Sequence, residues 1–432
     1  MHCISWTFYD FDFFHLFKDI ETNDVASSFQ LNITYFLYFR IQNEKKNEVL
    51  PIIVIAQFCC TCLWFAGNAV LKELMQHFNV GTSALEDLTS AVQFGFITGT
   101  LLFAIFTIVD RFSPSKVFFL CAFLGALANI CLIIEGNTDV TLLFFRFLTG
   151  FFLAGIYPVG MKIATDYYQK GLGTSLGFII GALTLGTALP HLLRGSMDAY
   201  SWKTVLIAIS MLSAIGGSLL LLFVPDGPFR KKSSSINLKV CFKLFKHTPF
   251  RKAAFGYFGH MWELYAFWTF VPIVLKTYSD LHTDTHFNIP LLSFLSIGVG
   301  SLGCVLGSYL AVKFGTQKVA FYSLVLSGIC CVLTPLLFFS ANELLFVLFL
   351  FFWGMVVIAD SPLFTTLVAQ NTPEKNRGTA LTVVNCVGFA ITIISIQGLS
   401  SLYQNTNTLF IYWFLAMGPV FGVFAIGTKR RL

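Results

Sequence analysis

The sequence predicts an all-α integral membrane protein with 12 transmembrane helices, arranged as two pseudo-symmetric six-helix bundles. Of its 432 residues, 56% are hydrophobic and only 12% are charged, about half the charged share of a soluble domain. Apolar runs of about 20 residues, the length of a membrane-spanning helix, recur along the chain. Patterns in the first half also return in the second. Together these features exclude a soluble globular protein, a disordered chain, a nucleic-acid binder with a broad basic face and a disulfide-stapled secreted module.

The apolar runs are expected to be helices, because an isolated strand in lipid leaves its backbone groups unpaired. Since twelve is an even number, both termini lie on one side of the membrane. In chain order, the expected spans are 50–75, 87–109, 117–134, 140–165, 173–193, 203–224, 253–276, 289–312, 319–340, 343–369, 378–402 and 408–428.

The basic residues predict which side that is. Most of the 28 Lys and Arg residues lie in the tails and in the loops on one side, and basic loops face the cytoplasm. We therefore expect a cell-membrane protein with both termini in the cytoplasm. The expected division is an N-terminal extension 1–48, a bundle 49–225, a basic linker 226–252, a second bundle 253–428 and a tail 429–432.

The first 48 residues do not fit this pattern. They carry several acidic residues but no basic stretch before an apolar run, so they are not an ordinary signal peptide. One interpretation is an accessory amphipathic segment. The favoured interpretation is a wrongly assigned start of the chain.

Two local patterns recur about 204 residues apart. The motif KxxGTxL occurs at 170–176 and again at 375–381. A Gly and a Pro eight residues apart occur as Gly150 and Pro158, then as Gly354 and Pro362. The halves are therefore predicted to be copies of one six-helix unit in the same membrane orientation, with the substrate path between them near the midplane.

These motifs resemble the major facilitator superfamily over residues 49–428. The loop after span 2 carries Asp110, Arg111 and Lys116, similar to the family's cytoplasmic loop motif, although both of its glycines are absent. The second copy keeps Lys313 and Lys318 but lacks the Asp. The resemblance implies that these five residues form a cytoplasmic gate. A solvated turn charge is the alternative for Asp110 and Arg111.

Two further matches concern spans 4 and 5. The family's Arg-x-x-x-Gly motif corresponds to Arg146 and Gly150, and its antiporter glycines correspond in part to Gly177, Gly181 and Gly186. The four glycines are expected to allow close helix packing. The partial glycine match slightly favours antiport. The run at 256–268 resembles a subgroup of bacterial permeases.

Four ionisable residues lie inside expected spans: Arg146, His260, Glu263 and Asp360. Each costs roughly 2.5–3.5 kcal/mol on insertion scales, so such residues are usually functional. His260 and Glu263 are three residues apart and share a helix face. With Asp360 they are the candidates for proton coupling. The alternatives are a structural polar pair that holds span 7 to a neighbouring helix for His260 and Glu263, and a cap at the break before Pro362 for Asp360.

Arg146 lies near the outer third of span 4. It is expected to bind an anion or to balance a carboxylate in the cavity. The alternative is a side chain that reaches the outer membrane surface.

A polar and aromatic stripe on span 1 indicates a cavity wall. Gln57, Trp64 and Asn68 fall within about 20° on a helical wheel, although packing between helices is an equal alternative. Tyr157, Tyr257, Trp262 and Tyr265 are further cavity candidates. The CxxC at Cys59 and Cys62 has no second Cys or His pair nearby and is interpreted as packing, so neither a metal nor a cofactor is expected.

The function predicted from these features is secondary active transport of a small solute by alternating access. The coupling ion is expected to be the proton, with efflux by antiport slightly favoured. A GxxxxGK[ST] motif for ATP is absent from the sequence. The alternatives are an uptake symporter, an integral-membrane enzyme or a non-transporting sensor. Expected partners are the solute, protons and membrane lipids, without nucleic acid, and the protein is expected to be a monomer.

Overall fold

The computed structural model describes residues 48–81, 83–168, 171–196, 200–230 and 243–427. Nearly all of the N-terminal extension, Lys170 of the first KxxGTxL motif, much of the basic linker and the C-terminal tail lie outside the described residues. The predictions made for those segments stay predictions. Residues from Val49 onward form one compact unit.

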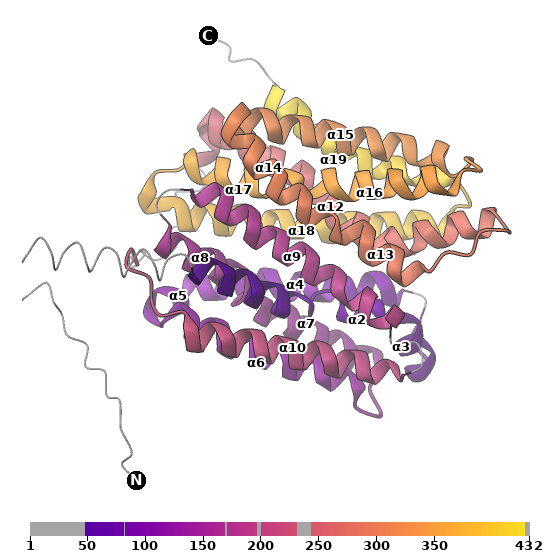
Figure 1. Ribbon diagram of the computed structural model, residues 1–432, viewed down its shortest axis with the longest axis horizontal. Helices are drawn as coiled ribbons and strands as arrows, with labels where there is room; N and C mark the ends of the chain where they lie inside the picture. The colour runs from indigo at the N-terminus through magenta and orange to yellow at the C-terminus, as the bar shows by residue number, and fades with distance from the viewer. Residues whose placement is uncertain (1–47, 82, 169–170, 197–199, 231–242, 428–432) are drawn as a thin grey trace, which may run out of the picture. The chain divides into compact units, whose positions relative to one another are not determined.

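The first half of this unit supplies six spans (Figure 1). In chain order they are a helix over Glu48–Thr61 continued by α2 (Ala66–Ala69) and α3 (Leu71–Phe78), then α4 (Ala84–Ile105) with the short α5 (Ile108–Arg111), α6 (Pro114–Ile130) with η1 (Cys131–Ile133), α7 (Asp139–Leu153) with α8 (Tyr157–Tyr167), α9 (Leu172–Ser196) and α10 (Trp202–Phe223).

The second half repeats this arrangement. Its elements are α12 (Thr248–Leu281), α13 (Ile289–Gly298) with α14 (Gly300–Phe314), α15 (Thr316–Leu337), α16 (Glu343–Ala359) with α17 (Ser361–Gln370), η2 (Glu374–Asn376) leading into α18 (Arg377–Asn405), and η3 (Leu409–Tyr412) leading into α19 (Trp413–Gly427). In Figure 1 the indigo-to-magenta helices of the first half lie beside the orange-to-yellow helices of the second.

Ten of the described helical segments are long and apolar enough to cross a membrane. The remaining two spans are the first, which is broken after Thr61, and α12, which is 34 residues long and carries His260 and Glu263. The prediction of 12 helices in two six-helix bundles is confirmed.

The fourth and tenth spans break at equivalent points. The starts of α7 and α16 are 204 residues apart, as are the starts of α8 and α17. In both spans the second segment begins with a Pro in its first two positions, where a residue without a backbone N–H ends one helix and suits the start of the next. The matching breaks support the predicted duplication.

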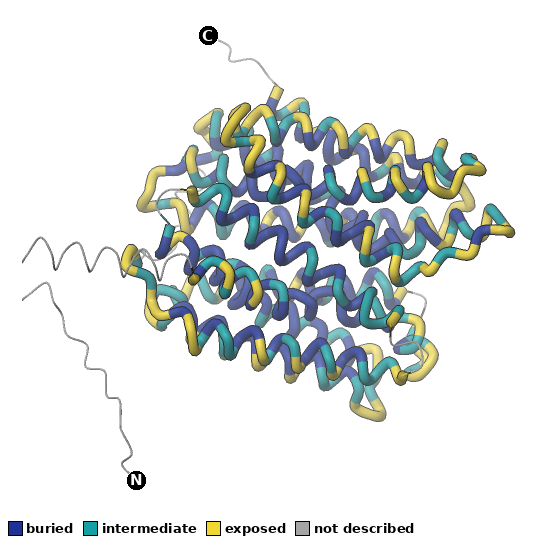
Figure 2. Tube along the Cα trace, in the orientation of Figure 1, coloured by how far each residue is buried: buried dark blue, intermediate teal, exposed yellow. Residues whose placement is uncertain are grey.

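Buried residues lie on the inner faces of the helices, and exposed residues lie on their outer faces and at their ends (Figure 2). Large apolar side chains lie on the outside, with Leu222, Val312 and Phe424 all more than 70% exposed. Charged side chains such as Arg146 and Glu263 lie inside, at 1% exposure or less. Apolar surface of this extent is stable only against lipid.

Two seams join the halves: α4 runs against α18, and α9 runs against α13 and α14. The second seam is close because two predicted packing glycines lie in it. A Cβ at Gly177 would lie 2.3 Å from Ser308 Oγ, and one at Gly181 would lie 3.1 Å from Ser301 O.

The other two packing glycines lie within the first bundle. A Cβ at Gly150 would lie 1.9 Å from the Val92 carbonyl oxygen on α4, so α7 can approach that closely only with glycine there. A Cβ at Gly186 would lie 2.3 Å from Thr61 Oγ1 in the first span. The four glycines thus serve two kinds of contact, within a bundle and between bundles.

Candidate functional site

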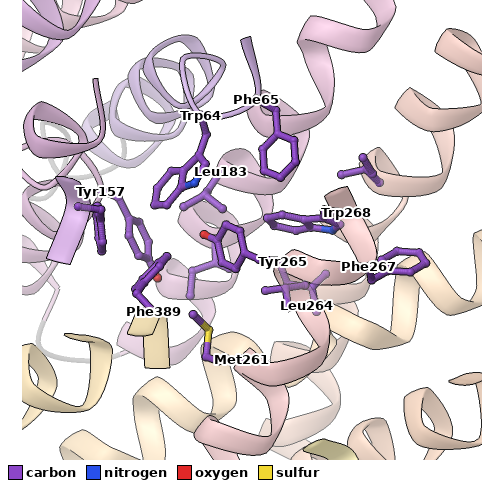
Figure 3. Packing of buried hydrophobic residues seen from close by; sticks show 14 of the residues in the cluster. Trp64, Phe65, Tyr157, Leu183, Met261, Leu264, Tyr265, Phe267, Trp268 and Phe389 are labelled. Carbon is purple, nitrogen blue, oxygen red and sulfur yellow. The ribbon is translucent and has the colours of Figure 1, made fainter. Parts of the chain in front are cut away.

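Aromatic rings from both halves meet between the bundles (Figure 3). The ring of Trp64, at the break of the first span, lies 5.0 Å from Phe96 of α4. It also lies 5.5 Å from Tyr265 of α12 and 5.5 Å from Phe389 of α18. We call Trp64, Phe96, Tyr265 and Phe389 the central aromatic cluster. Because each half contributes two rings, any relative movement of the bundles changes this cluster.

Two more of the predicted cavity residues lie beside the cluster. Tyr157, the first residue of α8, has its ring 6.5 Å from Phe96. Tyr257 of α12 lies against α18, where a Cβ at Gly388 would lie 2.6 Å from its ring. Phe96 and Phe389 were not predicted, because a Phe in an apolar helix has no distinguishing sequence pattern.

Buried N–H groups near the cluster have no protein partner. Trp64 Nε1 lacks a hydrogen bond within the described residues, and so does Trp268 Nε1. Trp268 lies 5.0 Å from Tyr265 and 6.2 Å from Phe65, ring to ring. A buried donor without an acceptor is costly, so water or a bound solute is the expected partner of each indole.

The predicted stripe on span 1 does not form one wall, and that prediction is wrong. The helical wheel assumed an unbroken helix, but the first helix ends at Thr61 and α2 begins only at Ala66. Gln57 instead lies against α8, where a Cβ at Gly160 would be 2.5 Å from its Oε1. Asn68 Nδ2 donates to Thr89 Oγ1 at 2.7 Å. Of the three, Trp64 is the residue whose ring lies in the central aromatic cluster.

Trp262 also lies elsewhere than predicted. Its Nε1 donates to the Phe414 carbonyl at 2.9 Å, and the two rings are 4.9 Å apart. Trp262 therefore packs α12 against the start of α19 inside the second bundle. Its neighbour in the chain, Met261, which is about 100° away around α12, is 2% exposed and lies near the cluster in Figure 3.

Arg146 of α7 holds the break in span 1 together. Its Nη1 donates to Leu63 O at 3.1 Å, and its Nη2 donates to Trp64 O. Both carbonyls lie in the break between Thr61 and Ala66, beyond the negative end of the first helix and outside its regular hydrogen bonding, so a buried guanidinium suits this place. The side chain is fully buried and is bound to backbone. The interpretations of Arg146 as a carboxylate partner and as a surface-reaching side chain are therefore wrong.

Glu263 lies inside the second bundle. Its Oε1 accepts hydrogen bonds from Trp353 Nε1 at 2.7 Å and from Cys331 Sγ at 3.2 Å. Its Oε2 accepts one from Ser327 Oγ at 2.8 Å. The donors come from α15 and α16, so these contacts tie α12 to both helices.

His260 pairs with Asp360 and not with Glu263. His260 Nδ1 lies 2.8 Å from Asp360 Oδ1, and both side chains are 1% exposed. This is an ion-pair distance, and His260 Nε2 lacks a partner within the described residues. Asp360 occupies the break between α16 and α17 but does not cap α17 through its side chain. His260 and Glu263 therefore do not pair with each other, and each instead contacts residues of other helices, while the side chain of Asp360 does not take the predicted capping role.

The five predicted gate residues lie at the linker side of the bundles. Arg111 Nε donates to Thr107 Oγ1 at 3.0 Å, and the backbone oxygen of Asp110 accepts from Arg230 Nη2 at 3.3 Å. The remaining three, Lys116, Lys313 and Lys318, are exposed. In the part of the chain that the structure describes, no ion pair joins any two of the five.

Comparison with known proteins gives the family. The profile of the major facilitator superfamily matches residues 53–396. No curated protein matches the chain in sequence.

Solved structures of transporters share the fold. The proton:xylose symporter XylE is 12% identical with a TM-score of 0.70, and the similarity covers 89% of this chain and 95% of XylE. The human organic anion transporter MFSD10 (TETRAN) is also 12% identical with a TM-score of 0.70, over 88% of this chain and 99% of that one. The nucleoside transporter NupG is 16% identical with a TM-score of 0.65, over 88% and 99%. The profile match, which spans most of the chain, and the shared 12-helix fold lead to one conclusion: this chain belongs to the major facilitator superfamily and is a multi-pass membrane protein with the fold of a transporter.

Proposed function

We propose that the protein is a secondary active transporter that moves a small solute by alternating access, with the path between the bundles at the central aromatic cluster. The observation that supports this most is that Trp64 and Phe96 from one half meet Tyr265 and Phe389 from the other. A solute that separates these rings contacts both bundles at once, so its binding energy can favour one arrangement of the bundles over another. The unpaired indole N–H of Trp64 supplies a donor for that solute.

We further propose that transport is coupled to protons through His260 and Asp360. The pair is buried and within ion-pair distance, and each member changes charge when it gains or loses a proton. Asp360 lies at a helix break, so a small movement of α17 separates it from His260. The separation changes the free energy of keeping the imidazole and the carboxylate charged. Glu263 is the alternative coupling residue, although three donors already hold its carboxylate.

We propose exchange with protons, that is efflux, in the plasma membrane, with both termini in the cytoplasm. The basic residues on the linker side of the spans support this orientation, and the antiporter-like glycines Gly177, Gly181 and Gly186 support exchange. Uptake by symport is the alternative direction. The solute, protons and the surrounding lipids are the partners of this cycle, which a monomer can carry out.

The test uses purified protein in liposomes that contain a pH-sensitive dye. A panel of sugars, nucleosides, organic anions and aromatic amines is added singly, and protein-dependent proton movement identifies a transported solute. We expect Asp360→Asn to lose accumulation driven by a pH gradient while it retains solute exchange, because exchange needs binding and movement but no net proton transfer.

Three outcomes contradict parts of the proposal. Equal gradient-driven accumulation by Asp360→Asn and the parent contradicts coupling through Asp360, and the same experiment on Glu263→Gln then tests the alternative. Accumulation that is independent of the pH gradient contradicts proton coupling altogether. If no solute moves in liposomes, and none differs in amount between cells that lack and cells that overproduce the protein, the sensor interpretation replaces transport.

We also propose that Asp110 and Arg111 belong to a gate on the linker side. They are the last two residues of α5, the short helix after α4, and Arg230 of the linker segment donates to the backbone of Asp110 and Phe112. In a variant with Cys386 as its only cysteine, Asp110→Asn should label faster with a maleimide, because Cys386 of α18 is buried against Ile97 of α4. Unchanged labelling favours the solvated-turn interpretation.

A further inference from the structure

We propose that Glu86 and Asp87 of α4, with Gln397 and Gln404 of α18, form a latch that closes the solute path on the membrane side opposite the linker. We call this side the far side. The inference rests on the proposed alternating-access function, and it assigns to these residues a positioning role.

The contacts cross between the two bundles. Gln404 Nε2 donates to Glu86 Oε1 at 2.8 Å. Gln397 Nε2 lies 3.3 Å from Asp87 Oδ1 and 3.1 Å from Ser90 Oγ. The two glutamines are seven residues apart, two turns along one face of α18. They therefore meet the first two turns of α4 as one row.

The two carboxyl groups of the latch have no basic partner in the described part of the chain. Among the described residues, no ion pair involves Glu86 or Asp87. Glu86 is 5% exposed, and its Oε2 is buried without a hydrogen bond. When the path closes, a hydrogen bond from an amide stabilises a buried carboxylate less than a hydrogen bond from Arg does. When the path opens, breaking the amide contact leaves no buried cation without a partner. This arrangement suits a contact that opens and closes in every cycle.

The position of the latch on its seam indicates which side it controls. Toward the midplane, the seam continues with the Phe96–Phe389 ring contact and the contact of Cys386 Sγ with Ile97 O. Nearer the linker than Cys386, no hydrogen bond or ring contact joins α4 to α18 within the described ranges. The latch therefore supplies the polar contacts between α4 and α18 at the far end. If these contacts are lost, the two helices separate first at that end.

The other seam is built differently. Along α9, small residues bring the helices together, as at Gly195, where a Cβ would lie 2.9 Å from Pro290. The polar side-chain contact that joins α9 to α14 is the long one between Thr184 Oγ1 and Cys304 Sγ at 4.0 Å, so these helices can slide or rock with little polar contact to break. A substitution that changes charge should therefore alter the strength of the contacts between α4 and α18 more than that of the contacts along α9.

A cysteine at Gln93 reports on the latch. Gln93 is fully buried on α4, two turns below Glu86 on the same face, and neither of its amide atoms has a partner in the described part of the chain. In a variant with this cysteine alone, a membrane-impermeant maleimide added from the far side labels the position only when that side opens. The reagent is the probe, so no knowledge of the solute is needed.

Charge reversal gives the decisive comparison. Gln404→Glu sets a carboxylate against Glu86 and should raise the labelling rate about tenfold, because like charges at this distance repel. The double variant Glu86→Lys with Gln404→Glu restores an attractive pair and should return the rate to the parent value or below it.

Asn405→Glu is the matched control, because it adds the same charge one residue further along. Asn405 donates only within its own helix, to Ser401 O at 2.8 Å and to Ser401 Oγ at 3.4 Å. We expect it to leave labelling unchanged. A rate for Gln404→Glu equal to the parent's, or an equal increase for Asn405→Glu, overturns the latch, and so does failure of the double variant to restore the rate. Monodisperse elution of every variant shows that it is folded.

The result is separable from the proposed function. Labelling measures opening and not solute movement. If the latch variants behave as expected but the parent moves no solute in liposomes, the latch stands and transport fails. If the parent transports and labelling does not respond, transport stands and the latch fails.

Discussion

Replacing Arg146 with Ala should weaken the fold by releasing the break in span 1. The guanidinium is fully buried and donates to the carbonyl oxygens of Leu63 and Trp64. A hydrogen bond to a charged group contributes about 1.5–3 kcal/mol in soluble proteins, and hydrogen bonds in membranes average about 0.6 kcal/mol. Two lost bonds, together with two carbonyls left without a partner, give an expected loss of about 2–4 kcal/mol in the free energy of unfolding.

Two measurements check this prediction. Unfolding in mixed micelles with increasing detergent denaturant gives the loss of stability. The reactivity of Cys62 with N-ethylmaleimide gives the local opening, because Cys62 lies at the break, is buried, and donates to Cys59 O at 2.7 Å. We expect faster labelling of Cys62 in Arg146→Ala than in the parent.

Arg146→Lys is the control, because it keeps the charge but lacks the planar fork that reaches two carbonyls. Its stability should lie between those of the parent and of Arg146→Ala. If Arg146→Ala unfolds within about 0.5 kcal/mol of the parent, below the value of one such bond, and Cys62 stays unreactive, the break does not depend on Arg146 and the reasoning is refuted.

Three further predictions concern packing, the N-terminus and pH. Gly150→Leu should greatly lower the yield of monodisperse protein, because the new Cβ meets the backbone of α4. Gly173→Leu should leave the yield unchanged, because nothing lies within 4 Å of a Cβ there. Equal yields of the two variants contradict the packing role of Gly150. A chain starting at Glu48 should insert and transport as the full chain does, and loss of folded protein in that variant contradicts it. Hydrogen bonds from Lys203 and a nearby His lower the pKa of Glu135 below 4.5, so these contacts stabilise the fold above that pH and are lost as pH falls through the lowered pKa. The unfolding temperature of the parent should therefore drop more steeply on acidification than that of Glu135→Gln, and identical pH profiles contradict this.

Several features of this protein could be read from the sequence because they depend on local properties of the chain. A span needs about 20 apolar residues in a row, wherever its neighbours lie. The breaks before Pro158 and Pro362 follow from the missing N–H of proline and recur 204 residues apart. The fold, the duplication and the family were therefore predicted before any contact was known.

The tertiary structure decided which buried polar groups meet. A helical wheel gives the face of a residue on its own helix but not the helix that the face meets. His260 and Glu263 share a face closely enough to predict a pair, yet Asp360, one hundred residues further on, pairs with His260, and Trp353 donates to Glu263.

The break after Thr61 was also outside the reach of the sequence. No Pro or Gly marks Cys62–Phe65, so the wheel placed Gln57 and Trp64 on one wall. At the interruption, Arg146 of another span donates to two carbonyls, a contact that no local pattern of span 1 indicates. Lipid makes the spans readable from composition alone, whereas polar groups inside the bundles must find partners across helices, and those partners depend on how all twelve helices pack.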